Sequence, residues 1–358
     1  MSARPAAVST PVLDGVLTGG LSILGMGGVL VYFGLIRTGI LEAGTVDFVR
    51  GDWIALTILI NSPHFMASYR TLYVSKEEIL AHRWSTIFVP AVLLGVLFFG
   101  ALGPARETTF GWLVFGSSIY LAWHYTGQAW GMVASFSHLA GVRFTDRERA
   151  AIRFGMHALL VLHVLYALSG RLPPATWIAP ATYIEGYSLA FQGVCLAVAI
   201  GFGTGAWAFW NAHRRGPKLP VRALFPWLAL FIWYPFWYFI PGGFLWVQLS
   251  HALQYLAFPL RVEVNRLTAK GPRSSSQTAM HLAVLYLALV AVGAVILSGP
   301  PLAAQLFGHG WYSTPDARAI FIAVTNCVAI HHYFIDGAIW KLSNPKVRQE
   351  LFAHIARP

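Results

Sequence analysis

The sequence predicts an all-α membrane protein: a helix bundle of about ten transmembrane helices with both termini in the cytoplasm. The first observation is composition, because 56% of the 358 residues are hydrophobic, only 11% are charged, and the mean hydropathy is +0.59. A soluble domain of this length cannot bury so much apolar surface. The second is segment length, since several apolar stretches approach or exceed the roughly 20 residues that a bilayer-spanning helix needs.

Ten apolar segments are separated by short polar loops. The predicted spans cover approximately residues 16–40, 52–74, 84–103, 109–134, 151–170, 188–210, 222–241, 243–261, 279–299 and 317–340. The pair over 222–261 is rich in Pro and Gly, which allows either two full spans or a re-entrant hairpin. The chain is predicted to form one integral-membrane domain (1–358), with an N-terminal tail of about 1–15 and a C-terminal tail of about 342–358.

The third observation is the distribution of positive charge. With the N-terminus in the cytoplasm, 20 of the 25 Lys and Arg residues fall in cytoplasmic segments and 5 fall on the opposite side. This is the asymmetry that the positive-inside rule describes. The net charge of +11 is therefore a topology signal, with attraction to anionic lipids second. It does not indicate nucleic-acid binding.

Several function classes lack their sequence signals. Cys195 and Cys327 are the only cysteines, so neither a disulfide framework nor a cysteine-rich metal motif is available. Walker and dinucleotide-binding motifs are absent, and the N-terminus has no short apolar region ending in a cleavage site. We expect a multi-pass protein of the bacterial inner membrane, without a removable signal peptide.

Seven of the 13 histidines fall inside predicted spans: His64, His124, His157, His163, His251, His331 and His332. His251 and His331 each precede a cytoplasmic basic residue by ten positions, or about 15 Å of helix, which is near the middle of a roughly 30 Å hydrocarbon core. His64 and His124 are predicted at similar depth. Ionisable groups within a span are costly and usually face the bundle interior.

Span 5 carries two of these histidines. His157 and His163 are six residues apart, about 240° around a helix, so both cannot face one small site. We expect His157, beside Arg153, to be the one that takes part.

Other polar residues share the histidine-bearing spans. In "IHHYFIDGAIWK", His332 and Asp336 are four residues apart and share a helical face, whereas His331 points about 100° away. We assign catalytic roles to Asp336, Tyr125 and Tyr255. Side chains expected to support a cofactor are Gln128, Gln254 and Asn61.

Neutral imidazole is a common ligand for iron, copper and zinc, and a carboxylate can ligate or orient an imidazole. Several imidazoles at one depth therefore predict a buried metal centre, with one or two iron ions favoured. Zinc and copper remain alternatives, and haem is less favoured. The predicted metal ligands are His64, His124, His157, His251, His331 and His332.

In gross plan the chain resembles the histidine-rich membrane oxygenases, desaturases and hydroxylases that use non-haem iron. The HH of "IHHYFID" is similar to the last part of a desaturase histidine box, but Asn326 and Cys327 stand upstream where another histidine is expected. Single histidines spread over many spans are more similar to the membrane iron dioxygenases that cleave carotenoids. No motif is shared, so no residue roles are carried over.

A metal site in the bilayer predicts an oxidoreductase that hydroxylates, desaturates or cleaves a lipid or isoprenoid. Membrane lipids and an electron-transfer protein are the expected partners. The alternatives are a transporter or proton-coupled carrier with a His/Asp relay, a haem-binding electron-transfer subunit, and a metal-free lipid-modifying enzyme.

Overall fold

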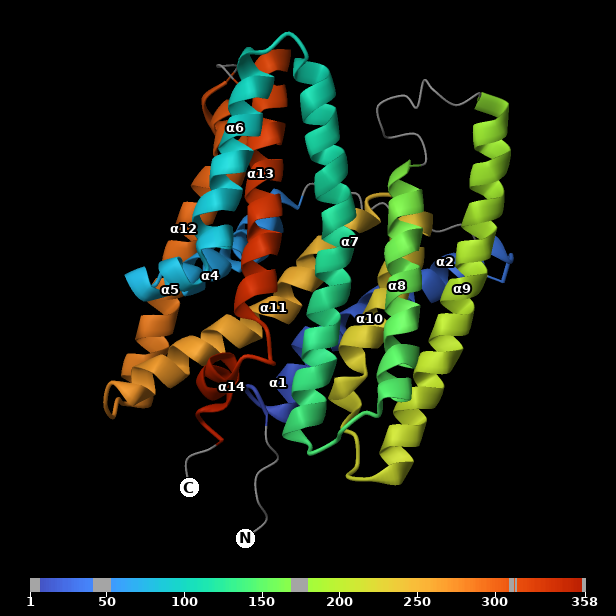
Figure 1. The fold of residues 1–358 in the computed structure, drawn as a ribbon, viewed down its shortest axis with the longest axis vertical. Coiled ribbons are helices and arrows are strands. Elements are labelled where there is room, and N and C mark those ends of the chain that lie inside the picture. The colour runs from blue at the N-terminus through green and yellow to red at the C-terminus, as the bar shows by residue number, and fades with distance from the viewer. Residues whose placement is uncertain (1–6, 41–52, 169–179, 309–311, 313, 356–358) are drawn as a thin grey trace.

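The computed structural model describes residues 7–40, 53–168, 180–308, 312 and 314–355. Every regular element in these ranges is helical, which confirms the predicted all-α class. One set of helices consists of α6 (Val89–Leu102), α7 (Arg106–Leu139), α8 (Asp146–Leu168), α9 (Pro180–Arg215), α12 (Ser275–Phe307) and α13 (Pro315–Ile339). Their axes follow the long direction of the molecule (Figure 1).

The predicted count of ten spans is not confirmed. Within the described residues, five helices are long and apolar enough to cross a membrane, or six if one bent pair counts as a single span. The length and apolar composition of these helices indicate an integral membrane protein. The 34-residue α7 is long enough but falls outside this group, since it carries polar residues such as His124 and Gln128.

The predicted first span is broken into short pieces. It comprises η1 (Val16–Gly20), η2 (Ser22–Met26) and α2 (Gly27–Arg37), and a further helix, α1 (Pro11–Gly15), lies in the predicted N-terminal tail. The segments Pro11–Gly20 and Ser22–Arg37 meet at a bend of 42°. The backbone leaves helical geometry at Gly19, where a side chain would collide with the backbone of Phe225. The Thr18 carbonyl instead accepts a hydrogen bond from Gln254 Nε2 at 2.8 Å. The break thus gives Gln254 a structural partner.

The predicted second span is also segmented, into α3 (Ile54–Leu56), η4 (Thr57–Asn61) and α4 (Ser62–Leu72). A short helix, α5 (Lys76–Ala81), follows, and η5 (Trp84–Phe88) leads into α6. The wider helical turn of η4 ends where Pro63 occupies the first turn of α4, a position that tolerates proline because its missing N–H would have no helical partner.

The 222–261 region forms two helices joined by a tight turn. The single turn η6 (Val221–Ala223) precedes α10 (Phe225–Phe239), and Gly242, at φ +79°, connects α10 to α11 (Gly243–Ala269). That backbone conformation favours glycine. With 15 residues, α10 is about 22 Å long, less than a hydrocarbon core. The helix α11 runs obliquely to that first set of helices and is buried along much of its length (Figure 1).

The first and last described segments of the chain meet. The helices α1 and α14 (Pro345–Phe352) lie at the same end of the molecule (Figure 1). His354 Nε2 donates to the Ala7 carbonyl at 2.7 Å, and Arg261 of α11 bonds the neighbouring Val8 carbonyl. Asp14 holds the same segment by accepting from the Val8 N–H at 2.8 Å. The side of the membrane on which this end lies stays a prediction.

Candidate metal centre

Four helices bring five polar side chains together inside the bundle. His64 comes from α4, His124 from α7, His251 from α11, and both His332 and Asp336 from α13. Each is at least nine-tenths buried, with exposed fractions of 0% for His332 and 8% for Asp336 at the extremes. We call these five residues the His/Asp cluster.

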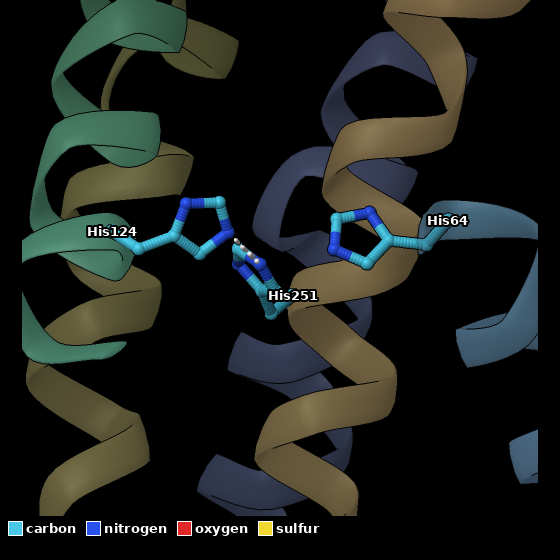
Figure 2. A group of neighbouring side chains, drawn as sticks. All are labelled: His64, His124 and His251. Carbon is cyan, nitrogen blue, oxygen red and sulfur yellow. Dashed lines mark hydrogen bonds between the residues drawn. The ribbon is translucent and has the colours of Figure 1, made fainter. Parts of the chain in front are cut away.

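The imidazole rings face one another through their Nε2 atoms. His124 Nε2 lies 2.9 Å from His251 Nε2, and His64 Nε2 lies 3.0 Å from His332 Nε2. Figure 2 shows the rings of His64, His124 and His251 directed toward a common point from their separate helices. Two groups have ligand atoms all within 4.8 Å of one another: His64 with His124 and His251, and His124 with His332 and Asp336.

Asp336 completes the cluster with only one of its two oxygens satisfied. Its Oδ1 accepts hydrogen bonds from Ser68 Oγ at 2.7 Å and from Tyr255 Oη at 3.0 Å. Its Oδ2 lies 3.5 Å from His332 Nε2 and 3.8 Å from His124 Nε2. This oxygen is buried and has no hydrogen-bond partner among the described residues. Such an atom is costly in a low-dielectric interior.

Neighbouring side chains fix the rings in place. The Gln128 side-chain amide lies beside His251, with its nitrogen 3.0 Å from Nδ1 and 3.2 Å from the His251 carbonyl. For Nε2 of His251 to bind a metal, Nδ1 would carry the ring proton and donate it to Gln128 Oε1, which is buried without a partner among the described residues. The Tyr125 and Tyr255 rings pack against His251 and His64 respectively, each with centroids 4.5 Å apart. The structure thus brings Gln128, Tyr125 and Tyr255 to the cluster, and their predicted catalytic and cofactor-binding roles stay predictions.

Four other predicted site residues lie outside the cluster. His331, on the same helix as His332, donates from Nε2 to the Ser85 carbonyl at 2.7 Å and accepts from Tyr69 Oη at Nδ1, 3.0 Å away. Both of its ring nitrogens are therefore satisfied by the fold, as the 100° offset from His332 implies. His157 is exposed on α8 and lines a small surface cavity with Arg153.

The remaining two are Gln254 and Asn61. Gln254 faces the N-terminal break described above. Asn61 is half-buried at the end of η4, and nothing places it among the cluster contacts. His163, which is not among the predicted ligands, is fully buried. Its Nδ1 lies 3.3 Å from Tyr234 Oη, and it belongs to neither ligand group.

Two residues that support the cluster were not predicted. Ser68 bonds Asp336 Oδ1, and Trp340 Nε1 donates to Tyr255 Oη at 2.9 Å. Each follows a cluster residue by four positions on the chain, Ser68 after His64 and Trp340 after Asp336. Residues four apart share a helical face, so that spacing is the signal that would have found them.

The position of His64 depends on close packing between α12 and α4. A side chain at Gly293 of α12 would meet Ser62 Cβ at 2.6 Å and Ser62 O at 2.8 Å, two residues before His64. We therefore expect Gly293→Leu to displace α4 and lower metal affinity about 10–100-fold, the usual effect of disturbing a ligand's support. Metal titration of the apoprotein measures this. Gly299→Leu, also on α12 but with its nearest atom 3.9 Å away, should bind metal like the wild type; equal affinity in both variants would contradict the link.

Comparison with known proteins adds no assignment: no protein-family model, no curated protein and no solved structure matches this chain.

Proposed function

We propose that this chain is a membrane-embedded iron-dependent oxidoreductase that acts on a lipid or isoprenoid. In this proposal the His/Asp cluster binds one iron ion, with His64, His124, His251, His332 and Asp336 as the ligand set. The resemblance to membrane non-haem iron oxygenases agrees with this assignment. The proposed location is the bacterial inner membrane, with both termini cytoplasmic.

The observation that carries the proposal is the unsatisfied Asp336 Oδ2 among the converging Nε2 atoms. An imidazole pair at 2.9 Å can share one proton, but it offers nothing to a second, buried carboxylate oxygen. A cation held by His124, His332 and Oδ2, whose ligand atoms lie within 4.8 Å of one another, would give this oxygen a partner.

The number of candidate donors favours iron over zinc. Structural zinc is almost always tetrahedral with four ligands, whereas this cluster offers five candidate donors.

The close packing of the four imidazole rings argues against a haem between these histidines. Two axial imidazoles on opposite faces of a haem iron would have nitrogens about 4 Å apart, with a flat macrocycle between the rings. The four rings of the cluster instead pack edge to face, with the His64 and His332 centroids 4.5 Å apart.

Bound iron would supply dioxygen chemistry toward an unactivated carbon chain. The residues of the chain would hold the ion, keep the rings in orientation and exclude water from the reacting groups. Ser68 and Tyr255 hold Asp336 through Oδ1, which leaves Oδ2 for the ion. Hydroxylation or desaturation would need two electrons from a redox partner, whereas cleavage by dioxygen needs none.

The test uses nitric oxide as a stand-in for dioxygen. Purified protein is loaded anaerobically with Fe(II), exposed to nitric oxide and examined by EPR. We expect the half-integer-spin signal of a nitrosylated non-haem ferrous ion, because an oxygenase keeps an open metal position. Asp336→Asn, which keeps the shape of the side chain but removes the anionic oxygen, should lose most of the signal. His157→Ala is the matched control and should retain it.

An iron-loaded sample without that signal would contradict the oxygenase proposal. Protein that binds no Fe(II) at all would leave a proton relay or acid–base enzyme as the better explanation.

A further inference from the structure

The cluster borders a cavity of about 230 Å³ between α7, α11 and α13. His124, Asp336 and Tyr255 line its inner part, and Lys341 and Leu342 line the part beyond the end of α13. The cavity therefore connects the cluster to the end of the molecule that carries α14. Binding of a metal ion by the cluster does not itself require this cavity.

Three glycines lie in the wall of this cavity. Gly127 and Gly131 lie one helical turn apart on α7, and Gly337 follows Asp336 on α13. A Cβ atom added at any of the three would meet nothing within 4 Å, so these positions border open space. The side chain of Asp336, 8% exposed and with Oδ2 unpartnered, also lines the cavity.

Six of the other fourteen lining residues are Trp, Tyr or Phe, and the two ends of the cavity differ in charge. Trp123 and Tyr333 contribute apolar surface near the cluster, while Lys341 is exposed at the outer end. Apart from Asp336, Lys341 is the only charged residue in the lining. Ligand pockets for drug-sized molecules measure about 300–1,000 Å³, so this smaller space suits one narrow chain.

We propose that this cavity binds a single apolar chain with an anionic head, with Lys341 contacting the anion and the chain passing Gly131 toward His124 and Asp336. A lysine at the end of an apolar pocket attracts a carboxylate or phosphate, and its stem can follow the apolar wall. Only the role of this ligand as the substrate rests on the proposed function. Binding itself requires no metal.

Photolabelling tests the proposal on metal-free protein in phosphatidylcholine nanodiscs. The probe is a long-chain fatty acid carrying a diazirine, and mass spectrometry locates the labelled peptides. We expect label on the segments 120–135 and 333–342, with competition by oleic acid but not by oleyl alcohol. Competition by lysophosphatidic acid stronger than that by oleic acid would place the anion on a lipid phosphate rather than a free carboxylate.

Two variants test separately the contacts of the ligand's apolar chain and those of its anionic head group. Gly131→Trp should fill the cavity and abolish labelling of both segments. Gly116→Trp is the matched control on α7, because Gly116 also borders open space but does not line the cavity. Because Lys341 is exposed, the Lys341→Met variant should still fold. This variant should weaken competition by oleic acid about tenfold, as expected for the loss of a charged hydrogen bond.

Unchanged labelling in Gly131→Trp, or equal competition by oleic acid and oleyl alcohol, would overturn the proposal. Because the protein is metal-free, labelling as expected in a chain that never binds iron would instead overturn the proposed function and leave this inference standing.

Discussion

Replacing His124 with alanine is expected to remove the bound metal while the protein still folds and inserts. His124 belongs to both ligand groups, with Nε2 2.9 Å from His251 Nε2 and 3.8 Å from Asp336 Oδ2. Disturbing an outer partner of a ligand typically costs about 10–100-fold in affinity, and losing a shared ligand should cost more. Metal content after purification, measured by mass spectrometry, should fall from about one equivalent to background.

Two other histidines provide matched controls for this variant. His163 is fully buried but bonds Tyr234, and His331 is buried with both nitrogens satisfied by Ser85 and Tyr69. Alanine at either position should leave metal content near that of the wild type, although thermal stability falls. Metal retained in His124→Ala, or lost equally in all three variants, would contradict the assignment of ligands.

Replacing Gly201 with leucine is expected to disrupt the packing of α8 against α9. The two helices meet at Gly155 and Gly201, where a Cβ on Gly155 would approach the Gly201 carbonyl oxygen to 2.8 Å. Small residues allow helix backbones in membranes to approach closely, and larger ones force them apart. Overpacking typically costs about 1–3 kcal/mol, and a backbone contact has less room to relax than a side chain.

Thermal unfolding in detergent measures the effect. The midpoint of Gly201→Leu should be clearly lower than that of wild type, or the variant should aggregate during size-exclusion chromatography. Gly203→Leu lies two residues along α9, where an added Cβ meets nothing within 4 Å, and should behave as wild type. Equal stability of both variants would show that the close approach at Gly201 is unimportant.

Hydropathy predicts the helical class and most long helices because a buried backbone in lipid must satisfy its own hydrogen bonds. It does not predict where a helix breaks. The first span divides at Gly19, where contact with Phe225, 206 positions along the chain, excludes a side chain. The short α10 and the oblique α11 likewise reflect packing that an apolar stretch does not encode.

The helical spacing of residues helped to predict which side chains lie in the cluster, whereas their predicted depth in the membrane was not sufficient. The four-residue spacing of His332 and Asp336 correctly places both on one face, and the structure brings His64, His124 and His251 to them. His331 is predicted at a suitable depth but lies on another face, where Ser85 and Tyr69 contact it. His157 shows the same limit: the sequence predicts its approximate level in the membrane but not the direction of its side chain, which is exposed.

Metal analysis of the gently purified wild-type protein, with an absorbance scan of the same sample, tests the central claim most directly. We expect about one equivalent of iron for each chain and no Soret band. A Soret band would assign the cluster to haem, and protein that contains no metal and takes up none from Fe(II) under anaerobic conditions would contradict the metal centre altogether.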